Sequence, residues 1–154
     1  MMHKLFSLLF LLFMSVSTAY AEKIKSSHEV TLSSGELVTI SEGLGEPQSI
    51  GSYGLRVYSI IDSKYPYDNF TTGIILTREG VVEKAAAYDV DKDGDDEIVV
   101  IVRSVGTGSY ISARAFKYNG KTLSVLISLD GLDKDIDPVQ SLESAFNKAS
   151  NPTP

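Results

Sequence analysis

The chain has 154 residues, with 14 Lys and Arg against 20 Asp and Glu, a formal net charge of −6 and no cysteine. The absence of cysteine excludes disulfides, thiolate zinc sites and cysteine nucleophiles. The acidic balance excludes the basic footprint of a nucleic-acid-binding protein, and it favours either encounter with a cationic partner or simply the solubility of an exported chain.

The N-terminus predicts a cleaved signal peptide. Lys4 precedes an apolar run from Leu5 to Met14, and Ala19-Tyr20-Ala21 matches an A-x-A cleavage site. The run is roughly half of the ~20 apolar residues that a membrane-spanning helix needs, which favours cleavage over retention as an anchor. We therefore expect residues 1–21 to be a signal peptide, residues 22–154 to form a single exported domain, and no membrane anchor to remain. Cleavage removes one lysine and no acid, so the mature chain carries a net charge of −7.

The mature chain reads as all-β. Short runs of apolar and β-branched residues alternate with turn signals such as Glu79-Gly80, Asp93-Gly94 and Asn119-Gly120. About eight short strands at this spacing are typical of a sandwich or barrel, and we predict an antiparallel β-sandwich. The predicted strands are residues 29–32, 36–40, 49–62, 70–78, 81–88, 97–103, 110–118 and 121–129.

Two segments depart from simple alternation. Residues 98–102 are apolar at every position, which predicts a central strand that is covered on both faces. Asp137-Pro138, followed by Val139, Leu142 and Phe146 at helical spacing, predicts a short C-terminal helix.

The acidic run DVDKDGDDE, residues 89–97, resembles a calcium loop. It has carboxylates at positions 1, 3, 5 and 9 and glycine at position 6, but valine at position 12, where an EF-hand requires glutamate. The pattern is closer to the calcium loops between strands of integrin-type β-repeat proteins. The alternative is a connection in which each aspartate caps its own turn. The candidate ligands of a structural calcium are Asp89, Asp91, Asp93, Asp95 and Glu97, and no other cofactor is expected.

An enzyme is not indicated. His28 is the only histidine of the mature chain, and it lies in a polar stretch that does not favour a buried Ser-His-Asp triad. The acids of residues 89–97 crowd into one turn, whereas the carboxyl groups of a glycosidase face each other across a groove.

The stretch RSVGTGSY, residues 103–110, connects two predicted strands with more residues than a tight hairpin needs. Its glycines permit backbone angles that other residues avoid and remove bulk, so the loop can enter a narrow cleft. Its hydroxyl groups can donate to acceptors inside such a cleft. The alternative is an ordinary hairpin turn with solvated hydroxyls. The candidate binding residues are Ser104, Gly106, Thr107, Gly108, Ser109 and Tyr110.

Residues 89–118, together with GSYGLRVYS at residues 51–59, resemble the periplasmic inhibitors of invertebrate-type lysozyme from Gram-negative bacteria. In that family an exposed loop with the motif Ser-Gly-x-Tyr inserts into the active-site cleft of the lysozyme. The motif maps to Thr107-Gly108-Ser109-Tyr110, with threonine in place of serine. The resemblance implies a periplasmic, non-enzymatic inhibitor that binds invertebrate-type lysozyme and protects the bacterial peptidoglycan. The oligomeric state stays open, a homodimer included.

A second function class is a calcium-stabilised β-module that binds carbohydrate or cell-surface ligands. Exposed tyrosine rings would supply its stacking faces, although tyrosines on strands more often pack against cross-strand neighbours. The candidate rings are Tyr53, Tyr58, Tyr65, Tyr67 and Tyr110.

Overall fold

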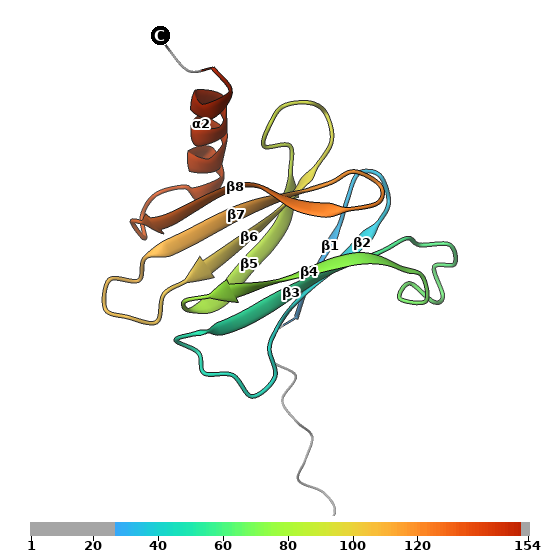
Figure 1. Cartoon of the computed structure of the whole chain (residues 1–154), viewed down its shortest axis with the longest axis horizontal. Coiled ribbons are helices and arrows are strands. Elements are labelled where there is room, and N and C mark those ends of the chain that lie inside the picture. The colour runs from blue at the N-terminus through green and yellow to red at the C-terminus, as the bar shows by residue number, and fades with distance from the viewer. Residues whose placement is uncertain (1–26, 152–154) are drawn as a thin grey trace, which may run out of the picture.

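The computed structural model of the chain describes residues 27–151, and the predicted signal peptide lies outside them. The described residues form two antiparallel four-stranded sheets and one helix (Figure 1). One sheet has the order β1-β2-β3-β4 and the other the order β5-β6-β7-β8. The strands are β1 (Ser27–Thr31), β2 (Leu37–Glu42), β3 (Gly51–Tyr58), β4 (Phe70–Arg78), β5 (Val81–Tyr88), β6 (Glu97–Arg103), β7 (Ile111–Tyr118) and β8 (Leu123–Leu132). The predicted antiparallel β-sandwich is confirmed.

Every strand in each sheet pairs with its neighbour in the chain, so the topology is two consecutive meanders. Residues 70–78, 81–88 and 97–103 form strands with the predicted bounds, whereas the predicted strand 49–62 is shorter and ends at Tyr58. β1 lies against β5 across the sandwich, and β4 lies near β8. His28 contributes to the first contact, because its Nε2 atom lies 3.3 Å from the carbonyl oxygen of Val82. The histidine therefore has a structural role at an edge of the sandwich.

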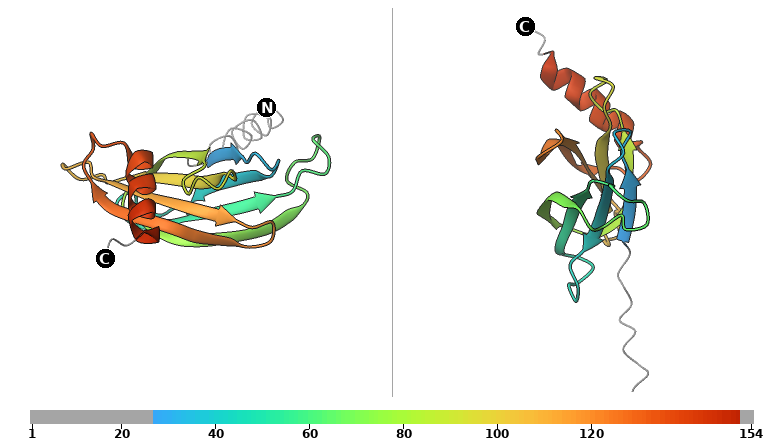
Figure 2. Two further views of the ribbon diagram at one scale, coloured as in Figure 1. Left: turned by 90° about the horizontal axis from the view of Figure 1, so that it is seen from above. Right: turned by 90° about the vertical axis from the view of Figure 1, so that its right-hand side faces the viewer.

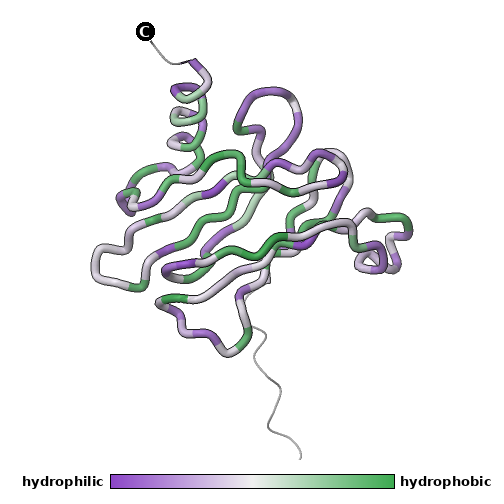
Figure 3. The backbone as a smooth tube through the Cα atoms, viewed as in Figure 1, coloured by the Kyte–Doolittle hydropathy of each residue, from purple (hydrophilic) through white to green (hydrophobic). Residues whose placement is uncertain are grey.

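Two apolar layers hold the fold together. The larger layer lies between the sheets, where alternate residues of β2 and β3 pack against alternate residues of β6. The smaller layer covers the outer face of the second sheet, where β6 and β7 pack against the helix. The tube coloured by hydropathy shows the apolar residues concentrated along the strands (Figure 3). Every residue of β6 from Glu97 to Val102 is buried, which confirms the predicted central strand.

The predicted C-terminal helix is α2 (Pro138–Ser150), which contacts β7 and β8 and projects beyond the edge of the second sheet (Figure 2). Asp137 caps its N-terminus by accepting hydrogen bonds from the backbone of Val139 at 2.9 Å and of Gln140 at 3.3 Å. Leu142 is its fully buried residue and packs in the smaller apolar layer. Among residues 27–151, no helix has the length and apolar character needed to span a membrane.

The two candidate motifs lie at opposite ends of β6. The acidic loop (residues 89–97) enters this strand, and the 104–110 loop leaves it at the other end (Figure 1). A partner that contacts the 104–110 loop therefore lies away from the acidic loop. The loop between β3 and β4 also projects on the far side of the molecule from the 104–110 loop.

Candidate functional site

The 104–110 loop is a compact hairpin tip with its own hydrogen bonds. The backbone N–H of Ser104 donates to the carbonyl of Tyr110 at 2.9 Å, which closes the stem. Within the tip, the N–H of Ser109 donates to the carbonyl of Gly106 at 3.1 Å, and the N–H of Gly106 donates to the hydroxyl of Ser104 at 3.2 Å. The loop therefore has a defined shape of its own, and it is carried by two strands of the sheet core.

The side chains at the tip face solvent. Residues 105–108 are exposed, and Tyr110 is 56% exposed although it directly precedes a strand. Ser104 and Ser109 are half-buried in the stem. Of the predicted binding residues, Thr107 and Tyr110 thus present their hydroxyl groups at the surface, and the two serines shape the loop beneath them.

Of the two roles predicted for the loop glycines, unusual backbone angles and absence of bulk, the first is wrong. Neither Gly106 nor Gly108 has a left-handed φ, and the residue that has one is Ser109, with φ of 48°. The reason for glycine at position 108 is space. A Cβ atom there would lie 2.8 Å from Cδ2 and 3.1 Å from Cζ of Tyr110, because the tyrosine ring rests against the glycine. Gly108 therefore provides the surface on which the ring of Tyr110 lies.

Two charged residues support the stem, and the sequence pattern did not reveal them. Arg103 donates from Nη1 to the carbonyl of Ser109 at 3.1 Å, and its guanidinium also binds the carboxylate of Glu83. Glu83 lies on β5 and Arg103 at the end of β6, twenty residues away. Only the pairing of β5 with β6 brings them together, so no local signal in the sequence could have identified the pair.

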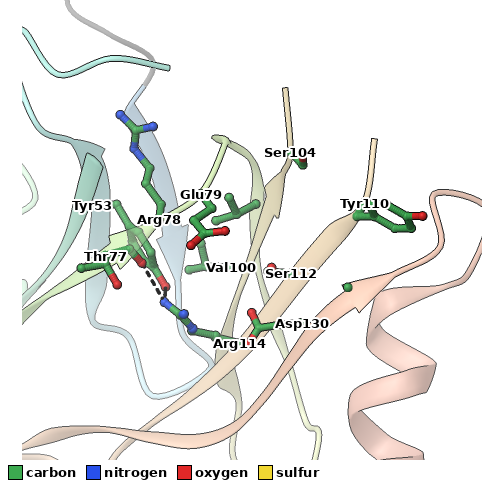
Figure 4. A pocket seen from close by; sticks show the side chains of 12 residues that line it. Tyr53, Thr77, Arg78, Glu79, Val100, Ser104, Tyr110, Ser112, Arg114 and Asp130 are labelled. Carbon is green, nitrogen blue, oxygen red and sulfur yellow. Dashed lines mark hydrogen bonds between the residues drawn. The ribbon is translucent and has the colours of Figure 1, made fainter. Parts of the chain in front are cut away.

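A polar cavity of about 470 Å³ opens beside the loop, between the two sheets (Figure 4). Ser104 and Tyr110 belong to its lining, and Arg114 crosses its floor. Arg114 donates to the hydroxyl of Tyr53 at 3.2 Å and to the carbonyl of Thr77 at 3.0 Å. Burial raises the pKa of the Tyr53 hydroxyl, and the hydrogen bond from Arg114 opposes this. The cavity lining thus carries charges of both signs, with Arg78 and Arg114 beside Glu79 and Asp130. The exposed ring of Tyr110 also belongs to this lining.

Arg78 anchors the turns beneath the 104–110 loop. Its buried guanidinium donates to the carbonyls of Ser52 at 3.0 Å, Gln48 at 3.1 Å and Pro47 at 3.2 Å, and also to that of Gly80. It also forms an ion pair with buried Glu42 at 3.4 Å. These contacts join the loop between β2 and β3 to the turn between β4 and β5.

The acidic loop forms the predicted turns capped by aspartate. The carboxylate of Asp91 accepts from the backbone N–H of Asp93 at 3.2 Å, and that of Asp93 accepts from Asp95 at 3.0 Å. Asp89 accepts from the N–H of Gly94 at 3.2 Å, and Gly94 has φ of 99°, which favours glycine. These bonds give Asp91, Asp93 and one oxygen of Asp89 a role in the turns that needs no metal.

A lysine supplies a positive charge to this loop. Nζ of Lys117, on β7, lies 2.6 Å from Asp91 Oδ2 and 3.3 Å from Glu97 Oε1, and it also contacts Asp93. Hydrogen bonds to Asp91 and Asp93 hold the pKa of Lys117 above its usual range. Lys117 lowers the pKa of Asp93, whereas burial raises the pKa of Glu97. No local pattern in the sequence indicates that Lys117, on another strand, reaches these acids.

The predicted calcium ligands only partly come together. Asp89, Asp91 and Glu97 can each place one oxygen within 4.8 Å of the others, and Oδ1 of Asp89 is buried without a hydrogen-bond partner. Asp93 and Asp95 lie outside this group. The three oxygens fit a hard cation, but Lys117 already contacts two of the three residues. Calcium binding stays a prediction, and a calcium ion would compete with the lysine ammonium for Asp91 and Glu97.

The tyrosines proposed as stacking faces do not form one surface. Tyr53 is 1% exposed and lies in the core between the sheets, which excludes it as a stacking face. Tyr58 is half-buried and makes edge-to-face contacts with Tyr67 and Phe70. Tyr65 and Tyr67 are exposed on the loop between β3 and β4, far from Tyr110.

Comparison with known proteins identifies a family. A sequence model of the family described as periplasmic lysozyme inhibitor of I-type lysozyme (PliI) matches residues 24–146. A comparison with curated proteins gives no match.

Two solved structures share the fold. The chain is 40% identical to PliI of Aeromonas hydrophila, with a TM-score of 0.72, over 76% of this chain and 98% of that one. It is also 40% identical to Aeromonas hydrophila PliI crystallised in complex with the lysozyme of Meretrix lusoria, with a TM-score of 0.71 over 77% of this chain and 95% of that one. Both likenesses span nearly the whole of the solved inhibitor chains.

Proposed function

The chain belongs to the family of periplasmic lysozyme inhibitors of I-type lysozyme, a family of non-enzymatic inhibitors, and we propose that it blocks such an enzyme by inserting its 104–110 loop into the active-site cleft. The observation that carries this proposal is the exposed tip, where Thr107 and Tyr110 present hydroxyl groups on an internally hydrogen-bonded loop. The lysozyme in the complex of the relative is an invertebrate enzyme, which supports the same class of partner for this chain.

The chemistry of the target explains why hydroxyl groups suit this task. Glycosidases of this kind cleave the sugar chain with two carboxyl groups that line a groove. The hydroxyls of Thr107 and Tyr110 can hydrogen-bond such carboxyl groups, and hydrogen bonds to a charged acceptor are the stronger kind. Threonine keeps the hydroxyl of the family's serine and adds a methyl group. Inhibition then follows from exclusion of the sugar and needs no reaction on the inhibitor.

The location and charge of the chain are consistent with this function. The family is named periplasmic, and we infer that cleavage after Ala21 releases the chain into that compartment. The mature net charge of −7 would speed encounter with a basic enzyme, an effect that salt weakens.

The test is lysis of a Gram-positive cell suspension by the Meretrix lusoria lysozyme, followed by turbidity while the mature chain is titrated. About 56% of the Tyr110 side chain is exposed. Aromatic residues bury about 200 Å², so roughly 110 Å² remains for the enzyme to cover, worth roughly 3 kcal/mol at about 25 cal/mol per Å². Tyr110→Ala should therefore weaken inhibition by up to about a hundredfold. Tyr110→Phe removes only the hydroxyl and should cost about tenfold.

Tyr65→Ala is the matched control, because Tyr65 is 52% exposed on the far loop and should not affect inhibition. If both Tyr110 variants inhibit as well as the parent, insertion of this loop is wrong even if inhibition stands. If the parent does not inhibit at all, the function is wrong. A pull-down on peptidoglycan, run beside one on immobilised lysozyme, then tests the carbohydrate-binding alternative.

A further inference from the structure

The 104–110 loop contains a strained residue that an arginine holds in place. Ser109 has φ of 48°, a left-handed conformation that residues with a side chain adopt at a cost. Its carbonyl oxygen accepts a hydrogen bond from Nη1 of Arg103 at 3.1 Å. This bond ties the returning arm of the loop to the end of β6, directly before Tyr110.

Glu83 orients the guanidinium that makes this bond. Its two carboxylate oxygens accept from Nε of Arg103 at 2.7 Å and from Nη2 at 3.0 Å. This bidentate geometry uses the Nε–Nη2 edge of the planar guanidinium, which an ammonium cannot match. The remaining nitrogen, Nη1, is thereby aimed at the loop.

A bulge in β5 places Glu83 where it can do this. The pairing of β5 with β6 skips Glu83, because Val82 pairs with Val102 and Lys84 with Ile101. Val82 and Ala85 both pack in the layer between the sheets, so Glu83 and Lys84 are both left on the exposed side. Bulges commonly redirect a side chain in this way.

The turn between β4 and β5 supports the same stem. Gly80 has φ of 125°, and a Cβ atom there would lie 2.6 Å from the carbonyl carbon of Arg103 and 2.9 Å from Cα of Ser104. The backbone of the turn therefore packs directly against the first residue of the loop. The stem is thus held by backbone contact with Gly80 and by the Arg103–Glu83 pair, both provided by β5 and the turn that precedes it.

We propose that Arg103 and Glu83 are positioning residues, which order the 104–110 loop in its binding conformation before the enzyme arrives. This inference rests on the proposed function of the loop. A loop that is ordered in advance binds more tightly because less conformational entropy is lost on association. The side chains of the pair are 31% and 41% exposed, so its contribution to global stability is small and its effect is on the shape of the loop.

The experiment compares four variants of the mature chain, one of which, Arg103→Lys, is a conservative replacement. Arg103→Met removes the guanidinium, Glu83→Gln removes the charge that orients it, and Arg56→Met is the matched control. Arg56 is an exposed arginine of β3, in the sheet that does not carry the 104–110 loop. It donates to the hydroxyl of Ser41 on β2 at 3.1 Å. Inhibition of the lysozyme is measured beside the melting temperature and the NMR hydrogen-exchange rates of the Ser104 and Ser109 amides in the free inhibitor. Both of these amides donate within the loop.

We expect Arg103→Met and Glu83→Gln each to weaken inhibition about five- to tenfold and to speed exchange of both amides, with little change in melting temperature. Arg103→Lys should inhibit more strongly than Arg103→Met but more weakly than the parent, since an ammonium cannot hold Glu83 and Ser109 in the same geometry. Arg56→Met should match the parent in all three measurements.

Two results would overturn the inference. Inhibition and exchange rates equal to those of the parent in both variants would show that the pair does not order the loop. Loss of inhibition in Arg103→Met alone, with unchanged exchange and a fully active Glu83→Gln variant, would show that Arg103 touches the enzyme directly. A parent that fails to inhibit would instead refute the proposed function, and the exchange rates would still report whether the pair orders the loop.

Discussion

Lys117 offsets part of the negative charge of the acidic loop, and its replacement by methionine should destabilise the protein. The substitution keeps an unbranched side chain and removes the ammonium that contacts Asp91, Asp93 and Glu97. Glu97 is fully buried, and the Lys117 side chain is 30% exposed. The variant therefore leaves several neighbouring carboxylates without this positive charge.

The magnitude follows from the burial of the partners. Removing one member of a buried ion pair costs about 3–5 kcal/mol, because the remaining charge is left in a medium of low polarity. Solvent reaches part of Lys117 and of Asp93, which reduces this to about 2 kcal/mol. For a domain of this size, such a loss lowers the melting temperature by roughly 6–10 °C.

The effect of Lys117→Met should be largest near neutral pH and should decline towards both ends of the pH range. The raised pKa of Lys117 means that its contribution is complete below the unfolded pKa of lysine and is lost only as the pH rises through the raised value. The lowered pKa of Asp93 means that its contribution is present above the ordinary pKa of aspartate and is lost as the pH falls. The difference between parent and variant should be constant from about pH 5 to pH 9 and should shrink below about pH 4.

The assay is thermal unfolding followed by circular dichroism, with chelator and with millimolar calcium. Lys121→Met, at an exposed lysine of the turn between β7 and β8, is the control and should change stability by less than about 0.5 kcal/mol. If the acids can hold calcium, the ion should stabilise Lys117→Met more than the parent, and Asp91→Ala should abolish any increment in the parent. A Lys117→Met variant that melts with the parent in chelator would refute the reasoning.

Three further outcomes are expected. Gly108→Ala should leave the melting temperature nearly unchanged, because the backbone at position 108 is not left-handed. It should weaken inhibition several-fold, because the added methyl group displaces the ring of Tyr110. Inhibition equal to that of the parent would show that the contact between Gly108 and the Tyr110 ring does not matter for binding. Arg78→Met should lose about 3 kcal/mol in urea unfolding, since the carbonyls of four residues lose a buried donor, and a loss no larger than that of Arg56→Met would contradict this. Protein recovered by osmotic shock should begin at Glu22 on N-terminal sequencing, whereas an intact Met1 in the membrane fraction would refute export with cleavage.

Local patterns were sufficient for much of the fold and for the position of the loop. Runs of apolar and β-branched residues between turn signals located β4, β5 and β6 to the residue, because both kinds of signal are local. The uninterrupted apolar run of β6 predicted cover on both faces, and Asp137-Pro138 predicted the start of α2. Glycines and hydroxyls between two strands were likewise enough to predict an exposed tip.

The tertiary structure alone decided which charges meet. Lys117 reaches Asp91 across 26 residues of chain, and Arg103 reaches Glu83 across 20. Both contacts depend on strand register, and the second also depends on a bulge that leaves Glu83 unpaired. A period-two pattern reports which face a residue occupies but not which residue of the neighbouring strand lies beside it. For the same reason, the sequence located the 104–110 loop, and the packing of Gly80, Arg103 and the Tyr110 ring determined its shape.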